Sequence, residues 1–329
     1  MSSASFEAVN YAVRPNKNVE RKLIAECLQG LVRRFDMQTY RYIGFGSMWF
    51  VDFILFHKLL LMEDMVSIER DSADRADFNK PFGCIAVEEG ESTTVLPTLK
   101  LDSKRAVVWL DYNSHLTGPI FEDIRIVCRS VPSGSIVMFT VNGNRRQIDD
   151  ETLVQKATLE DKDAARLAVL KKTAGDFLPN PMPAKPFSLQ AFPGLVADIL
   201  LAAIQHAVLT EGRPGKDDRF YPIFNFAYSD AAQMVTVGGM IASGTDRKLL
   251  DECELPVRCE YAKGTQQVLI DVPPLTLREK WAIDGLLPSD PSPSSEDLKN
   301  KFNFVIKDAQ LEEYCRYYRF YPVFSEFHG

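Results

Sequence analysis

The sequence contains few of the residues that build metal centres and disulfide frameworks. It has six cysteines and four histidines in 329 residues, and no two cysteines are spaced as a Cys-x-x-Cys pair. Scattered thiols of this kind are typical of reduced, cytosolic proteins. We therefore expect no metal site, no disulfide and a cytoplasmic location.

Long apolar runs and an excess of basic charge are also missing. The N-terminus, MSSASFEAVNYAVRPNK, lacks the apolar core of a signal peptide, and the longest apolar stretch, residues 192–209, is interrupted by polar residues. A membrane helix needs about 20 apolar residues, so we expect a buried helix here and no membrane as a partner. The net charge of −7 does not favour sequence-independent binding to phosphates. Nucleic acid is left open as a partner but is not indicated by this charge.

What the sequence does contain is an alternation of strands and helices. The apolar runs 106–110 (AVVWL) and 135–141 (SIVMFTV) are typical of parallel strands that are covered on both faces. Two extended runs, 220–228 and 233–242, are separated by SDAA and predict an antiparallel hairpin. A third extended piece is expected at 267–272. The predicted fold class is α/β with a doubly wound, mostly parallel sheet.

Apolar spacing predicts three helices in the first quarter of the chain. The first covers residues 18–36, with Asn18 as its N-cap, and the second covers about 48–62. The third covers 72–82, with Phe78 as the side chain that anchors it.

The most informative stretch is residues 40–71, YRYIGFGSMWFVDFILFHKLLLMEDMVSIERD. A strand at 41–45 leads into a glycine turn, a helix and a second strand that ends at Glu69. This order is that of the first unit of a nucleotide-binding Rossmann half, in which an acid about 20 residues beyond the glycines binds the ribose. The stretch therefore predicts a cofactor that contains adenosine. The competing interpretations are a tight turn without a ligand and a strand-end glutamate paired with Arg70.

Two further groups of polar residues follow predicted strands. Gly90, Glu91 and Ser92 follow the third strand, and Asp111 and Tyr112 end the fourth. Ligands of open α/β sheets bind at the carboxyl ends of the strands, so both groups are candidates for the site. The alternatives are a charged loop for the first group and a structural role for Asp111.

Other polar residues leave alternatives open. His115 could replace Asp111 as a base, although a lone loop histidine is more often a surface residue. Arg14, Lys17, Glu20 and Arg21 precede the first strand and could hold a carboxylate or phosphate. We favour a solvated helix start for them. The aromatic segment 314–321 could stack on nucleic-acid bases, but packing into the core or against a dimer partner is favoured.

The order of these elements, with the segments GFGS, FVDF, IERD, NKPFG and LDY, resembles the class I S-adenosylmethionine-dependent methyltransferases. It also resembles a group of bacterial proteins described as O-methyltransferases, some of which lie beside mobile-element or phage-defence genes. The chain differs from the usual pattern in having Met48 for a third glycine and Tyr42 where an acid is common. The resemblance implies a seven-stranded sheet that ends in the antiparallel hairpin.

The same resemblance implies the organisation of the chain. Residues 1–37 would be an N-terminal helical segment that can cover the pocket as a lid. Residues 38–245 would be the Rossmann-like domain, with a helical insert at about 145–215, and residues 246–329 a C-terminal extension.

The resemblance also implies S-adenosylmethionine as cofactor and a methyltransferase activity. The implied cofactor-binding residues are Gly44, Phe45, Gly46, Ser47, Glu69, Arg70, Glu91, Ser92, Asp111 and Tyr112, with Asp111 also the catalytic candidate. The predicted function is methylation of an oxygen or a nitrogen of an unidentified acceptor. The alternative is a non-catalytic cofactor- or nucleic-acid-binding subunit of a bacterial defence or mobile-element system. An oligomer or a protein partner is compatible with both.

Overall fold

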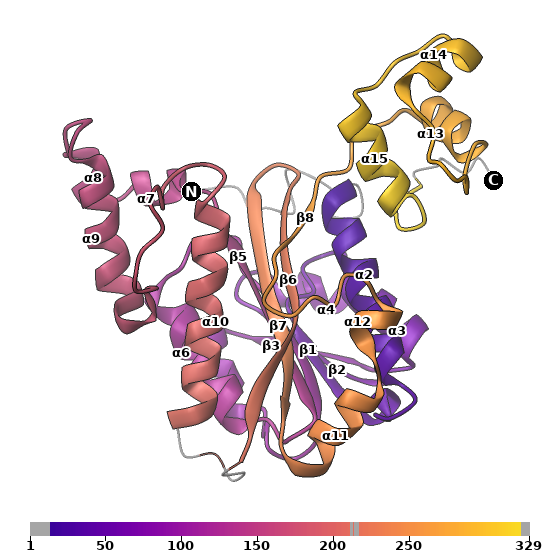
Figure 1. Ribbon diagram of the computed structural model, residues 1–329. Coiled ribbons are helices and arrows are strands. Elements are labelled where there is room, and N and C mark those ends of the chain that lie inside the picture. The colour runs from indigo at the N-terminus through magenta and orange to yellow at the C-terminus, as the bar shows by residue number, and fades with distance from the viewer. Residues whose placement is uncertain (1–13, 211–212, 214–216, 324–329) are drawn as a thin grey trace.

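The computed structural model describes residues 14–210, 213 and 217–323 (Figure 1). Of the predicted N-terminal segment, residues 1–13 therefore lie outside the described part, as do residues 324–329 of the predicted extension. A single sheet runs through the described residues, with helices on both of its faces.

The sheet has eight strands within the described residues, in the order β3-β2-β1-β4-β5-β7-β6-β8. Their bounds are β1 (Arg41–Gly44), β2 (Asp64–Glu69), β3 (Ile85–Glu89), β4 (Ala106–Asp111), β5 (Ser135–Asn142), β6 (Arg219–Ser229), β7 (Gln233–Ala242) and β8 (Val268–Ile270). Strands β1 to β5 are parallel, and β7 is antiparallel to both β5 and β6. The predicted fold class and the hairpin are confirmed.

The predicted number of seven strands is wrong, because the extended piece near residue 270 joins the sheet. It forms β8, which pairs in parallel with β6 at the edge. The start of the predicted C-terminal extension is thus continuous with the Rossmann sheet.

Helices cover both faces of the sheet, and further helices lie beyond its carboxyl end (Figure 1). Their bounds are α2 (Pro15–Leu31), α3 (Val51–Leu60), α4 (Ala73–Asn79), α5 (Ser92–Val95), α6 (Gly118–Ser130), α7 (Arg146–Asp149), α8 (Thr152–Gln155), α9 (Lys162–Ala174), α10 (Phe192–Thr210), α11 (Gly244–Glu252), α12 (Leu255–Arg258), α13 (Leu277–Asp284), α14 (Ser295–Phe302) and α15 (Asp308–Tyr317). Helices α2 and α3 pack together on one face, and α6 and α10 on the other. Successive β4 residues alternate between the two cores: Trp109 lies in the first and Leu110 in the second.

Three details of the predicted helices are wrong. Helix α2 begins at Pro15 and not at an Asn18 cap, because proline suits the first helical position, where its missing N–H is not needed. Helix α3 begins only at Val51, since Ser47 and Phe50 have φ of 55° and 47°, outside the helical region. Phe78 is 88% exposed and anchors nothing in the described core.

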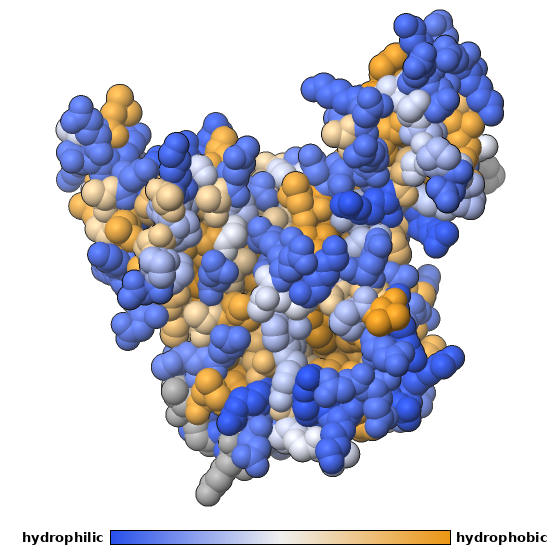
Figure 2. Space-filling model, in the orientation of Figure 1, coloured by the Kyte–Doolittle hydropathy of each residue, from blue (hydrophilic) through white to orange (hydrophobic). Residues whose placement is uncertain are grey.

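The insert and the C-terminal helices flank the carboxyl end of the sheet. Figure 1 shows α8 and α9 on one side and α13 to α15 on the other. Mostly hydrophilic residues cover the visible face of this C-terminal lobe, α13 to α15 (Figure 2). Two tyrosines of α15 face inward: Tyr314 and Tyr317 are fully buried, and the Tyr317 hydroxyl donates to the Leu269 carbonyl of β8 at 3.2 Å. The favoured interpretation, packing rather than base stacking, is confirmed for these two tyrosines.

Helix α10 contains the long apolar stretch. Its segment Phe192–Leu209 is long and apolar enough to cross a membrane by length and composition, but 61% of it is buried in the fold. The helix packs against α6, β6 and β7. It is the buried core helix that the sequence predicts.

Candidate active site

The glycine turn after β1 is shaped by close packing beneath it. A Cβ atom on Gly46 would lie 2.5 Å from the Phe50 ring and 2.7 Å from Ser67 Oγ. A Cβ on Gly44 would lie 2.7 Å from Tyr42 Oη. The Tyr42 ring itself packs edge-on against Phe53 and is buried. Only glycine allows the turn to lie this close to the strand ends.

Glu69 ties the end of β2 to this turn. Its Oε1 accepts hydrogen bonds from the Ser47 backbone N–H at 2.9 Å and from Ser67 Oγ at 2.7 Å, and Ser67 Oγ accepts from Gly46 N–H at 2.8 Å. Burial raises the pKa of Glu69, and these hydrogen bonds oppose the rise. Arg70 pairs instead with Asp71, at 2.9 Å, and with Glu91, at 3.8 Å. The competing interpretation of a Glu69–Arg70 pair is therefore wrong.

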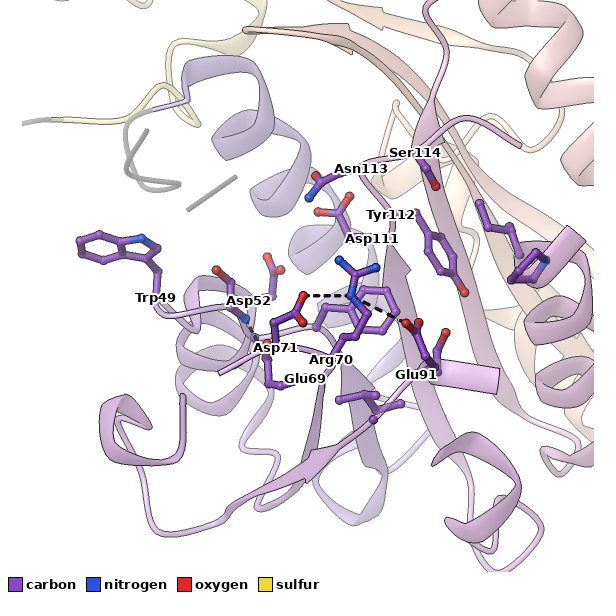
Figure 3. Close-up of a pocket in the computed structure, with 18 of the residues that line it drawn as sticks. Trp49, Asp52, Glu69, Arg70, Asp71, Glu91, Asp111, Tyr112, Asn113 and Ser114 are labelled. Atoms are coloured by element: carbon purple, nitrogen blue, oxygen red, sulfur yellow. Dashed lines mark hydrogen bonds and ion pairs between the residues drawn. The ribbon is translucent and has the colours of Figure 1, made fainter. Parts of the chain in front are cut away.

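A cavity of about 510 Å³ opens at the carboxyl ends of β1, β2 and β4 (Figure 3). The predicted cofactor residues on its wall are Phe45, Gly46, Ser47, Glu69, Arg70, Glu91, Ser92, Asp111 and Tyr112. Gly44 lies within β1 and not on the wall. The volume falls within the range of roughly 300–1,000 Å³ that is usual for small-molecule sites. We call this space the large cavity.

One side of the large cavity is held in place by the carboxylate of Asp123, which was not among the residues predicted from the sequence. Asp123 of α6 is buried, and its Oδ2 accepts hydrogen bonds from Ser92 Oγ at 2.5 Å and from Tyr112 Oη at 2.6 Å. Burial raises the pKa of Asp123. The Tyr112 ring meets Phe45 edge-on, with centroids 5.3 Å apart. Asp123 thus fixes the orientation of two wall residues, whereas Glu91 at the rim is exposed.

Helix α2 contributes buried charges to the opposite side. Arg21 Nε donates to Asp52 Oδ1 at 2.5 Å, and both residues line the large cavity. Lys17 Nζ lies 2.8 Å from Asp111 Oδ2 and 2.9 Å from Glu20 Oε2. The prediction of a solvated helix start is wrong for these residues, because α2 packs against α3 and β6 and leaves Lys17 and Arg21 only 3% exposed.

The charge state of Lys17 follows from its surroundings. Burial disfavours the ammonium, but the carboxylates of Asp111 and Glu20 outweigh it and raise the pKa of Lys17 above its usual value. Burial also raises the pKa of Glu20, against the effect of Lys17. Lys17 is therefore a fixed positive charge beside Asp111 at neutral pH.

His115 lies outside the site. Its backbone N–H donates to Gln147 Oε1 at 3.0 Å, and its ring lies 3.8 Å from Glu151. It lines neither the large cavity nor the smaller one next to it. The surface interpretation fits His115 better than a role as base.

The described residues contain no group of side chains that could bind a metal ion. Among residues 14–210, 213 and 217–323, no three His, Cys, Asp or Glu side chains come together in a way that could hold an ion. All six cysteines lie in the described ranges and are free thiols.

The fold and the site together define a class of protein. The order β3-β2-β1-β4-β5-β7-β6, with β7 antiparallel, and a cavity at the carboxyl ends of β1 and β4 are those of a class I S-adenosylmethionine-dependent methyltransferase. The chain belongs to the family described as "Putative O-methyltransferase", whose model matches residues 9–329. The predicted family and the predicted enzyme class, a methyltransferase, are confirmed.

Solved structures resemble the chain at low identity. Trm1 from Pyrococcus horikoshii, solved with S-adenosyl-L-methionine, is 11% identical with a TM-score of 0.42, over 71% of this chain and 57% of that one. The O-methyltransferase TomG from Streptomyces achromogenes, also solved with this cofactor, is 15% identical with a TM-score of 0.36, over 66% of this chain and 79% of that one. These likenesses concern the fold only. No protein of curated function matches the chain by sequence.

Proposed function

We propose that the protein transfers a methyl group from S-adenosylmethionine to an oxygen of an acceptor, and that the cofactor binds in the large cavity. One observation carries the proposal: Gly46, Glu69 and Asp111 face a single cavity of about 510 Å³ at the carboxyl ends of three neighbouring strands. The glycine turn and the strand-end acid are side by side, and protein atoms do not fill the space in front of them.

The wall residues suit the parts of this cofactor. Glu69 uses Oε1 for the turn, and a carboxylate has further acceptor sites on its second oxygen for the ribose hydroxyls. Glu91 and Ser92 lie on the wall where the adenine would bind.

The amino-acid end of the cofactor would meet the Arg21–Asp52 pair. The Arg21 guanidinium would bind the methionine carboxylate and Asp52 the ammonium group. This pair would then supply the charge that the chain lacks at Tyr42, where the family usually has an acid.

Methyl transfer depends mainly on the orientation of the acceptor relative to the cofactor. The cofactor supplies a methyl group on a positively charged sulfur, and the acceptor oxygen must approach in line with the bond that breaks. Asp111 ends β4 on the wall of the large cavity. It could accept a proton from an acceptor hydroxyl within hydrogen-bond reach.

Calorimetry with S-adenosylmethionine tests the proposal. We expect saturable binding, and we expect Thr117→Trp, which fills part of the large cavity, to abolish it. Thr94→Trp is the matched control, because Thr94 is exposed and lies off the wall. The absence of heat and of a thermal shift at millimolar cofactor would contradict the proposal.

Turnover separates the enzyme from the alternative of a non-catalytic subunit. An enzyme releases S-adenosylhomocysteine when the protein is incubated with cofactor and a fractionated cell extract. A sensor or an assembly subunit of a defence system would bind the cofactor and release none with any fraction.

A further inference from the structure

A second, smaller cavity adjoins the large one. It measures about 250 Å³ and is enclosed by the start of α2, the ends of β4 and β5, α7 and the β6–β7 hairpin. Asp111 and Asn113 line both cavities. A molecule in this small cavity would therefore meet the contents of the large cavity at the end of β4.

The small cavity contains a buried ammonium group that points to a ligand. Lys17 is 3% exposed and lines the wall. Its Nζ lies 2.8 Å from Asp111 Oδ2 and 2.9 Å from Glu20 Oε2, and the centroid of the Trp109 ring is 4.6 Å away. An ammonium has three N–H donors, and the two carboxylates engage at most two of them. An oxygen atom of a bound molecule would accept a hydrogen bond from the third.

The rest of the wall describes the molecule to which this oxygen belongs. Arg14 and Lys17 supply two positive charges, and Asp111 and Asp230 supply two negative charges, so the wall has no net charge. Tyr228 and Met234 add an aromatic ring and a thioether, which favour contact with another ring. The small cavity has about half the volume of the large one, 250 Å³ against 510 Å³. It can hold a single ring but not a second nucleotide-sized group.

We propose that the small cavity is the acceptor site, that it takes an uncharged monocyclic phenol, and that Lys17 binds the phenolic oxygen. The inference rests on the proposed function, since it places the acceptor beside the cofactor cavity.

The reaction would then proceed with a balanced transfer of one proton and one methyl group. The phenolic O–H gives its proton to the Asp111 carboxylate, which passes it to water. The oxygen uses a lone pair to form the bond to the methyl carbon, and the carbon–sulfur bond breaks with its electron pair going to sulfur. Lys17 remains protonated throughout and offsets the negative charge on the oxygen. The products are an aryl methyl ether and a neutral thioether.

4-Nitrophenol is a suitable probe, because its phenolate absorbs visible light and its neutral form does not. The protein is saturated with S-adenosylhomocysteine and titrated at a fixed pH at which the free phenol is mostly neutral. We expect the phenolate band to appear and to saturate at millimolar probe. No spectral change and no binding at this concentration would overturn the inference.

Two variants connect the signal to the small cavity. Lys17→Met should reduce the phenolate signal at least tenfold, whereas Lys17→Arg should retain part of it. Because Lys17→Met removes a buried charge, a second variant leaves the charges intact: Ala232→Phe, at the hairpin, fills the cavity and should abolish the signal. Ala86→Phe, an exposed position on β3, is the control.

The result also separates this inference from the proposed function. Wild-type binding of S-adenosylmethionine together with a probe signal that Lys17→Met and Ala232→Phe leave unchanged would reject the acceptor site alone. A failure to bind S-adenosylmethionine would reject the proposed function, whatever the probe shows.

Discussion

The two cavities that meet at Asp111 are built in different ways. The large cavity is lined mainly by residues 45–120, from consecutive strand–turn–helix units. The small cavity joins the start of α2 to the β6–β7 hairpin, more than 200 residues later: Asp230 accepts hydrogen bonds from the backbone N–H groups of Asn16 and Lys17, both at 3.0 Å. The cofactor side is thus a property of the local fold, whereas the proposed acceptor side depends on how one helix is docked.

This difference predicts that the two sides can be damaged separately. Substitutions of Glu69 should weaken binding of the cofactor without changing the structure of the small cavity. Changes at Asp230 should loosen α2 and the small cavity while the glycine turn stays in place.

Among the changes that test this separation, the largest effect is expected from Glu69→Gln. The amide keeps the size of the side chain but removes the charge that the ribose hydroxyls would bind, and a hydrogen bond to a charged group contributes about 1.5–3 kcal/mol. The Kd for S-adenosylmethionine measured by calorimetry should rise by about tenfold to a hundredfold. Glu89→Gln is the control, because Glu89 pairs with Glu69 across β2 and β3 but is exposed. Equal losses in both variants would mean that the cofactor lies elsewhere.

Asp230→Ala should have the next largest effect, on stability. The Asp230 carboxylate accepts hydrogen bonds from two backbone N–H groups at the start of α2 and from the Asn16 side-chain amide. Its loss removes a cap at the positive end of a helix, which costs about 1–2 kcal/mol.

Thermal unfolding measures this loss. The Tm should fall by a few degrees, and the 4-nitrophenol signal should weaken, while the Kd for S-adenosylmethionine changes little. Asp102→Ala, in an exposed turn, is the control. An unchanged Tm would show that the hairpin does not hold α2, and the comparison between the cavities would fail.

The sequence predicted the large cavity better than the small one for a physical reason. Glu69 and Asp111 each end a strand and Gly46 lies in the turn that follows one, so local patterns alone bring them to one edge of a parallel sheet. The charged residues that α2 and α3 contribute to the two cavities do not lie at strand ends. Asp52 contacts Arg21, 31 residues away in sequence, and Lys17 contacts Asp230, 213 residues away. Charges at the start of a helix look the same in sequence whether the helix is solvated or docked, so the buried cluster of α2 could not be distinguished from a surface.

The remaining errors share this origin. Nothing local shows that the short segment Val268–Ile270 pairs with β6 and becomes an eighth strand. The apolar Phe78 predicts an anchor, yet it is 88% exposed, and α4 packs mainly against the edge strand β3. The sequence predicts a glycine turn beside a cofactor, and the structure adds that Gly46 makes room for Phe50 and Ser67 beneath this turn.

The smallest effect is expected from pH, and it is specific to the cofactor side. Burial raises the pKa of Glu69 above its ordinary value of 4.5. Bound ribose hydroxyls donate to the ionised carboxylate, so the affinity for S-adenosylmethionine should be constant at high pH and fall as the pH drops through this raised pKa. The loss should begin at a higher pH than for an ordinary glutamate and amount to a few-fold before the protein unfolds.

The sign of the stability effect separates this loss from acid unfolding. A carboxyl group whose pKa is raised in the folded state destabilises that state when it is ionised, and this cost disappears as the pH falls through the folded pKa. As the pH falls over the window in which affinity is lost, protonation of Glu69 therefore stabilises the free protein and does not unfold it. Calorimetry between pH 8 and pH 5, with circular dichroism at each step, measures both quantities. Glu69→Gln should show no such decline, and a decline of equal size in that variant would assign the pH dependence to another group on the cavity wall.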